Sequence, residues 1–126
     1  MAQGVRQKEK EMSSPQRGEI YLVEFDPARG HEIQKTRPAL IIQNDIGNRY
    51  SPVTIVAAIT SQFAAPLHPT DVIVEGAQSG LSLPSAVVLN QIRSVDRQRL
   101  IRRLGRLEVA AMQLVDQAIK ISLGLI

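Results

Sequence analysis

Two short apolar runs separated by turn-forming residues constrain the fold of this chain more than any other feature. The runs extend from Ala39 to Ile42 and from Ile55 to Ile59. Both are rich in β-branched residues and too short for stable helices, so they are predicted to be buried strands. Residues 44–48 between them are dense in turn formers. The sequence therefore predicts an antiparallel hairpin with a long loop.

This hairpin brings two polar residues to one end. Arg37 opens the first strand and Thr60 closes the second. If Gln43 pairs with Thr54, Arg37 falls opposite Thr60, and residues directly opposite each other point to the same face. A slip of one residue would separate the two side chains, so the inference depends on the register. The alternative, which the hairpin alone favours, is an exposed edge arginine and an ordinary strand threonine.

Length and composition narrow the class of protein. A chain of 126 residues suits one domain, and the absence of cysteine excludes disulfides and thiolate metal sites. The apolar runs fall far short of the ~20 residues that cross a bilayer, and no signal-peptide core is visible. We therefore expect a cytoplasmic protein without membrane contact. The net charge of +3, with more arginine than lysine, is a mild hint of nucleic-acid binding.

The rest of the chain predicts one small β-rich domain. Residues 1–14 are polar and without period, which predicts a disordered tail before a domain at 15–126. Further strands are expected at 18–25, 71–74 and 85–95, and a helical turn capped by Asp96 is expected at 96–100. Residues 26–36 are predicted to form a long loop that leads into Arg37.

Apolar residues at helical spacing predict a C-terminal helix packed on the sheet. They are Leu107, Ala111, Leu114, Ala118, Ile121 and Leu125. Five short strands and one terminal helix predict a small antiparallel sheet or barrel. Because Leu123, Leu125 and Ile126 end the chain on an apolar note, we also expect an interface there and hence a homodimer.

Four motifs in order resemble a known family. They are Arg17-Gly18-Glu19-Ile20-Tyr21, Arg37-Pro38 with the stretch that follows to Pro52, Ala58-Ile59-Thr60-Ser61, and Asn90-Gln91-Ile92-Arg93-Ser94-Val95-Asp96. From Arg17 to the C-terminus the chain is similar to the MazF/PemK toxins of bacterial toxin–antitoxin pairs, and most similar to MazF of the Gram-positive type.

The resemblance implies a fold and a function. The implied fold is mainly β, a five-stranded SH3-like barrel with a C-terminal helix, assembled as a homodimer. The implied activity is a toxin endoribonuclease that cleaves single-stranded RNA, including mRNA, at selected sequences without metal or cofactor. It would leave 2′,3′-cyclic phosphate and 5′-hydroxyl ends, and a MazE-like antitoxin would inhibit it in a groove shared with RNA.

The resemblance also implies the site residues. Arg37 and Thr60 would be catalytic, and the loop at 26–36 would border the RNA groove. Contacts with RNA would come from Gln34, Lys35, Gln43, Asn44, Ser61 and Gln91. Several of these have other interpretations: Gln91 as a polar cap on a core strand, and Gln43 and Asn44 as turn residues.

The chemistry fits these residues. RNA supplies its own nucleophile, the 2′-hydroxyl, so the protein must stabilise a charged phosphorane and help to move protons. Arg37 suits the charge and would assist proton transfer, and the Thr60 hydroxyl would bind the scissile phosphate. General acid and general base are not separately identifiable. His31 and His68 lie outside any metal-ligand pattern.

Two other functions compete with RNA cleavage. Small barrels also serve as non-catalytic modules that bind RNA or protein, and a related toxin on the same fold poisons gyrase. Neither alternative needs the pair of Arg37 and Thr60.

A basic stretch runs through Arg93, Arg97, Arg99, Arg102, Arg103 and Arg106. Its favoured interpretation is a solvated face with antitoxin or dimer contacts rather than an RNA track.

Overall fold

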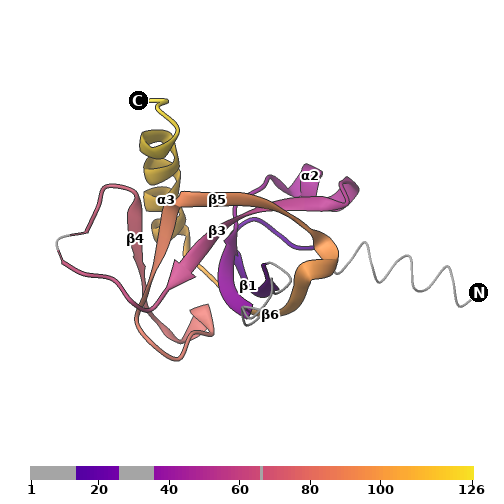
Figure 1. Ribbon diagram of the computed structural model, residues 1–126, viewed down its shortest axis with the longest axis horizontal. Coiled ribbons are helices and arrows are strands. Elements are labelled where there is room, and N and C mark those ends of the chain that lie inside the picture. The colour runs from indigo at the N-terminus through magenta and orange to yellow at the C-terminus, as the bar shows by residue number, and fades with distance from the viewer. Residues whose placement is uncertain (1–13, 26–35, 66) are drawn as a thin grey trace, which may run out of the picture.

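The computed structural model describes residues 14–25, 36–65 and 67–126, and within them the chain forms one antiparallel sheet (Figure 1). The strands are β1 (Glu19–Glu24), β2 (Thr36–Ile41), β3 (Val53–Thr60), β4 (Asp71–Val74), β5 (Ser85–Asp96) and β6 (Leu100–Arg106). Their order across the sheet is β4-β5-β3-β2-β1-β6, and every neighbouring pair is antiparallel. Two α-helices accompany them, α2 (Asp45–Tyr50) and α3 (Val109–Ser122). The mainly β fold with a C-terminal helix is confirmed.

The prediction of five strands was one short, because β6 carries little apolar signal. Three of its seven residues are arginines, and β6 lies at an edge of the sheet, where charged side chains are common. Gly105 lies within β6, and a larger residue does not fit there. A Cβ at this position would lie 2.2 Å from the carbonyl oxygen of Gln78, which belongs to the 3-10 turn η1 (Ala77–Ser79). A basic stretch with a glycine therefore forms a strand that the alternation of apolar residues does not predict.

The loop predicted between the hairpin strands contains a short helix. The turn formers at 44–48 act as its cap and first turn: the Asn44 side chain accepts from the Gly47 amide at 2.7 Å, and Asp45 follows at the first helical position. The helix is only six residues long, so its capping residues dominate the local sequence pattern. In contrast, the helical turn expected after Asp96 is confirmed as η2 (Arg97–Arg99), with the Asp96 carboxylate accepting from the Gln98 amide.

The sheet has a hydrophobic cluster on each face. The first, which includes Ile20, Leu40 and Leu89, lies beneath α3. The second, which includes Ala39, Ile41 and Val56, lies where β1 curls over the opposite face. The described helices are too short and too polar to span a bilayer.

The C-terminal helix packs on the sheet through only part of its predicted apolar stripe. Val115 and Ala118 are buried against the first cluster, with Met112 packed beside them. Leu114 is instead 61% exposed, and Ile121 and Leu125 are also exposed. The predicted apolar stripe therefore mixed two faces, because α3 is apolar over more than the face that packs on the sheet.

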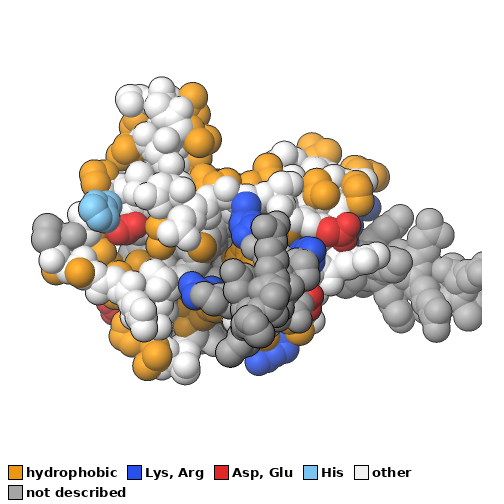
Figure 2. Space-filling model, viewed as in Figure 1, with side chains coloured by type: hydrophobic (Ala, Val, Ile, Leu, Met, Phe, Trp, Pro, Cys, Tyr) orange, Lys and Arg blue, Asp and Glu red, His pale blue; other side chains and the backbone are white. Residues whose placement is uncertain are grey.

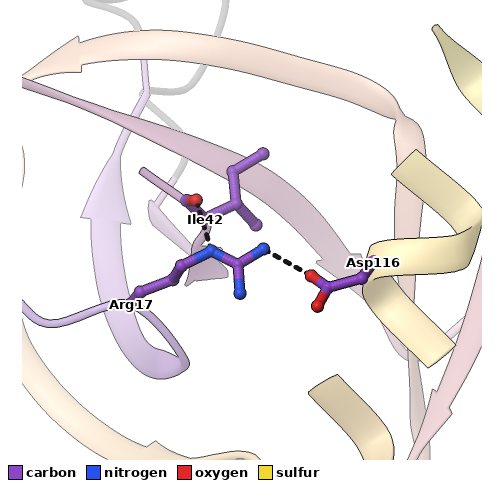
Figure 3. A network of polar contacts seen from close by, with 3 residues as sticks. All are labelled: Arg17, Ile42 and Asp116. Atoms are coloured by element: carbon purple, nitrogen blue, oxygen red, sulfur yellow. Dashed lines mark hydrogen bonds and ion pairs between the residues drawn. The ribbon is translucent and has the colours of Figure 1, made fainter. Parts of the chain in front are cut away.

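Arg17 joins three distant parts of the fold (Figure 3). Its Nε donates to the Ile42 carbonyl at 2.9 Å, and its Nη2 contacts the Asp116 carboxylate of α3 at 2.6 Å. Its backbone amide donates to Asp45 at 2.7 Å. The first residues of the domain thus hold the exit of β2 and the helix α3 together. Ser14 belongs to this ordered part, since it accepts from Arg97 at 3.1 Å, and the remainder of the predicted tail lies outside the described residues.

Candidate functional site

The register of the β2–β3 hairpin decides whether Arg37 and Thr60 share a face. Ala39 pairs with Ala58, and Leu40 pairs with Ala57, which is the predicted register. Continued for two residues beyond Ala39, it places Arg37 opposite Thr60, on the face that carries Ala39 and Ile41. Arg37 is exposed and Thr60 is half-buried. The structure therefore brings a guanidinium and a hydroxyl to the same end of the sheet.

Local hydrogen bonds orient the Thr60 hydroxyl. Its Oγ1 accepts from the Gln62 amide at 3.0 Å and donates to the Gln62 carbonyl at a longer 3.3 Å. The accepted bond fixes the oxygen at the end of β3. The donated bond is long, so the proton can turn toward a stronger acceptor such as a phosphate oxygen.

A bulge in β5 presents two amides beside this pair. Ala57 pairs with Ile92, but the next residue, Ala58, pairs with Val88, so residues 89–91 have no partner on β3. Leu89 turns into the core, whereas Asn90 and Gln91 are exposed. Because Ala58 precedes Thr60 by two residues, the bulge lies about 7 Å along the strand from Thr60. Bulges commonly redirect side chains near functional sites.

Two other predicted RNA contacts lie at the far end of the hairpin and have structural partners. The Gln43 amide nitrogen donates to Asn48 at 3.1 Å and to the Val53 carbonyl at 3.0 Å. Asn44 caps α2 through Gly47. The structure does not bring either residue to Arg37 and Thr60, and their side chains hold the turn together. Here the alternative interpretation, as turn residues, matches the observed contacts.

Of the remaining predicted RNA contacts, Ser61 lies within the described residues and two others do not. Ser61 directly follows Thr60 and is exposed. Gln34 and Lys35 lie outside the described residues, as does most of the 26–36 loop that leads into β2. The pair of Arg37 and Thr60, with Ser61 and Gln91 nearby, therefore forms the described part of the candidate site.

Most of the basic stretch is committed to contacts within the domain. Arg103 forms an ion pair with Glu19 at 2.8 Å, and Arg97 donates to Ser14. Arg99 donates to two backbone carbonyls of β1 and its following residue, and Arg93 stacks on Phe25. The stretch is largely solvent-exposed, as predicted, since Arg93, Arg102, Arg103 and Arg106 are exposed, but several of its arginines also contact β1 and the residues around it. The signal that sequence reasoning missed was the Glu19 carboxylate in β1, which pairs with Arg103.

Tyr21 of β1 lies next to β2, where it pairs with Ala39. Burial raises the pKa of Tyr21, and the neighbouring Glu19 carboxylate raises this pKa further, so the phenol stays protonated at neutral pH. His68 is exposed in the segment before β4. Among the described residues, no three His, Asp or Glu side chains gather closely enough to hold a metal ion. What the described site offers is charge stabilisation and oriented hydrogen bonds.

The chain and its fold are similar to known proteins. A family model for the "PemK-like, MazF-like toxin of type II toxin-antitoxin system" matches residues 16–123. The protein "Endoribonuclease EndoA" of Bacillus subtilis is 44% identical over 110 residues, covering 87% of this chain and 95% of the relative.

Solved structures are similar over nearly the whole domain. The MazE–MazF complex of Deinococcus radiodurans (Form-II) has a TM-score of 0.76 at 24% identity and covers 90% of this chain and 98% of its own. A mycobacterial endoribonuclease in complex with its cognate antitoxin has a TM-score of 0.74 at 25% identity, covering 89% and 97%. The family match spans most of the chain, and the identity to the Bacillus relative is high. The chain therefore belongs to the PemK-like, MazF-like toxins of type II toxin–antitoxin systems.

Proposed function

We propose that this toxin, an endoribonuclease, cleaves single-stranded RNA at the end of the hairpin where Arg37 and Thr60 meet. The observation that supports the proposal is the register of β2 and β3: continued two residues past the Ala39–Ala58 pair, it sets Arg37 opposite Thr60 on one face. The name of the Bacillus relative, which is 44% identical, supports the reaction class. The substrate in the cell would be mRNA in the cytoplasm.

The proposed reaction uses the 2′-hydroxyl of RNA as the nucleophile. The 2′-oxygen attacks the adjacent phosphorus and loses its proton, and the 5′-oxygen leaves and gains a proton. The products are a 2′,3′-cyclic phosphate and a 5′-hydroxyl end, so no water is consumed in this step. Arg37 would stabilise the negative charge that builds on the phosphorane. Thr60 would hold a non-bridging oxygen through its O–H.

The protein would need no metal or cofactor for this step. The charge that a metal would stabilise can be met by the positively charged guanidinium of Arg37. Arg37 also provides N–H groups that could pass a proton during the reaction. Ser61 and the exposed amide of Gln91 would contact the RNA on either side of the cut and contribute to sequence selection.

RNA cleavage in chelator with analysis of the ends tests this proposal. We expect a defined single-stranded RNA to be cut in excess EDTA, to give 2′,3′-cyclic phosphate and 5′-hydroxyl ends. Complete inhibition by EDTA that Mg²⁺ reverses would contradict the metal-free mechanism. RNA binding without cleavage, or supercoiling loss caused by gyrase poisoning, would point to the other functions of this fold.

We also propose that the toxin acts as a homodimer. Leu114, Leu123 and Ile126 are 59% to 73% exposed on α3 and at the chain end, and Figure 2 shows hydrophobic side chains gathered on this projecting helix. Exposed apolar surface of this kind on a small domain is typical of an interface, and a two-fold dimer is its commonest closed solution. Sedimentation at micromolar concentration should give twice the 13.9 kDa chain mass. A monomer that persists there would contradict the proposal.

The antitoxin is proposed to compete with RNA. The two similar complexes contain MazE or a cognate antitoxin by name. An acidic antitoxin segment would match the exposed cation of Arg37 and imitate RNA charge. Titration of the antitoxin into a toxin–RNA complex should release the RNA. Simultaneous binding of both ligands would contradict a shared groove.

A further inference from the structure

On the side that faces β6, the end of β1 is held by an arginine side chain instead of by a strand. Pairing between β1 and β6 ends where Val23 faces Leu100, because the chain before Leu100 forms η2. Glu24 and Phe25 extend past this point. The Nη1 of Arg99 donates to the Glu24 carbonyl at 3.3 Å and to the Phe25 carbonyl at 3.1 Å. The guanidinium thus replaces the hydrogen bonds that a longer β6 would supply.

The same stretch of β1 supports Arg37 from its other side. Val23 pairs with Arg37, and Glu24 pairs with Thr36, which are the last two pairs between β1 and β2. Arg99 therefore grips β1 within one residue of the strand position that faces Arg37. Any movement of this end of β1 passes through the ladder to the backbone of Arg37.

The Phe25 side chain is fixed as well. The guanidinium carbon of Arg93, on β5, lies 5.2 Å from the centre of the Phe25 ring, and Phe25 is 8% exposed. The backbone of Phe25 is held from η2 and its ring from β5. Both Arg99 bonds come from Nη1, whose N–H groups are held in fixed directions by the guanidinium plane, whereas an ammonium rotates on a flexible stem.

We propose that Arg99 is a positioning residue for RNA cleavage: through the end of β1 it fixes the orientation of Arg37 without touching the RNA. The inference rests on the proposed function of Arg37. A misplacement of about 1 Å in a reacting group can lower a rate about 100-fold. Arg99 is half-buried and its Nη1 donates to two carbonyls at the end of β1, which suits a brace better than a phosphate ligand.

The test compares three variants in RNA cleavage, with kcat and KM measured at several salt concentrations. Arg99→Gln removes the positive charge and the guanidinium. Arg99→Lys keeps the positive charge but replaces the planar guanidinium with an ammonium. Arg102→Gln is the matched control: it removes the same charge two strand positions after β6 begins, where the side chain is exposed and has no hydrogen bond or ion pair with any described residue.

We expect Arg99→Gln to lower kcat about 10- to 100-fold with KM within twofold of the wild type. Arg99→Lys should recover only part of this loss, and Arg102→Gln should retain the wild-type kcat. The dependence of KM on salt should be unchanged in Arg99→Gln, because no phosphate contact is lost. Should Arg99→Gln fail to fold, Arg99→Lys decides, with an expected kcat at least about fivefold below the wild type.

Other outcomes would overturn the inference. A wild-type kcat in Arg99→Gln, or full activity in Arg99→Lys, would remove Arg99 from the positioning of Arg37. A raised KM with a weaker salt dependence would make Arg99 an RNA ligand. Hydrogen exchange tests the contact between Arg99 and β1 without depending on RNA cleavage, so failure of this inference can be told apart from failure of the proposed function. Whether or not the wild type cleaves RNA, the Thr36 and Arg37 amides should exchange faster in Arg99→Lys than in Arg102→Gln, and equal rates would refute the brace.

Discussion

The two ends of the β2–β3 hairpin use polar side chains in opposite ways. At the turn end, Asn48 is fully buried, its amide nitrogen donates to the Gln43 carbonyl at 2.9 Å, and its oxygen accepts from Thr54 at 2.6 Å. At the open end, Arg37 is exposed, and Thr60 makes one short local bond and one long one. Polar groups at the first end are satisfied by the fold, and those at the second have fewer partners among the described residues.

The comparison teaches that residue type alone does not identify a binding residue. Glutamine and asparagine occur at both ends of the region, as Gln43 and Asn44 near the turn and as Asn90 and Gln91 in the bulge of β5. Those near the turn bond to neighbouring groups, whereas those in the bulge are exposed. What separates them is whether the fold already offers them hydrogen-bond partners.

The largest effect is expected at the open end, from Arg37→Ala. Losing one oriented charge donor typically costs about 10²–10³ in rate. The melting temperature should stay within about 2 °C of the wild type, because an exposed guanidinium adds little to stability. The control is Arg49→Ala at the turn end, which removes an exposed arginine that stacks on Tyr50. Cleavage by the control should match the wild type, and comparable losses in both variants would erase the distinction between the ends.

At the turn end, Asn48→Ala should reduce stability strongly. It leaves the buried Thr54 hydroxyl and the Gln43 carbonyl without their partners, at a cost of roughly 2–4 kcal/mol in the free energy of unfolding. The melting temperature should fall by on the order of 10 °C. Asn90→Ala, which truncates an exposed amide, serves as the control and should have the same melting temperature as the wild type. Equal melting temperatures for the two variants would refute the structural role of the turn-end network.

Thr60→Ala should have a smaller effect on rate than Arg37→Ala. Its hydroxyl contributes one hydrogen bond to the phosphate, so a loss of about 10- to 100-fold in kcat/KM is expected. Thr60→Ser keeps the hydroxyl and should retain most of the activity. Cleavage kinetics of both variants check this, and undiminished cleavage by Thr60→Ala would remove the hydroxyl from the mechanism.

The smallest effects are expected from two glutamine substitutions. Gln91→Ala should lower kcat/KM several-fold, or relax the cut sequence, with an unchanged melting temperature. Gln43→Ala should lower the stability by about 1–2 kcal/mol through its two lost bonds, while the folded fraction keeps its activity. Mapping of RNA ends together with thermal melts measures both. A reversed pattern would mean that the turn end, and not the bulge, contacts RNA.

The sequence predicted the central hairpin, and the register it assumed, Gln43 with Thr54, agrees with the observed pairing of Ala39 with Ala58. The apolar runs of β2 and β3 did not fix this register by themselves, because they are apolar on both faces. The sequence did not predict β6, where arginines on an edge strand mask the pattern, or α2, where turn formers act as a helix cap. The face of α3 that packs on the sheet was predicted only in part, because Leu114 and Ile121 are apolar but exposed.

For the candidate site, strand spacing set Arg37 opposite Thr60 only if Gln43 pairs with Thr54, and their catalytic roles came from the family resemblance and stay a prediction. The grip of Arg99 on β1 could not be predicted, because it joins residues 75 apart to backbone carbonyls, which carry no sequence signal. The separation of Gln43 from Gln91 also depends on the bulge in β5, whose position follows from three-dimensional pairing.

A double-mutant cycle of Arg37 and Thr60 in RNA cleavage tests the central claim most directly. The two side chains are proposed to bind the same phosphate, so their effects should not add. We predict that Arg37→Ala combined with Thr60→Ala cleaves within about threefold of Arg37→Ala alone. A double variant slower than Arg37→Ala by the full factor seen for Thr60→Ala alone would show that the residues act independently, and would contradict a single site at this end of the hairpin.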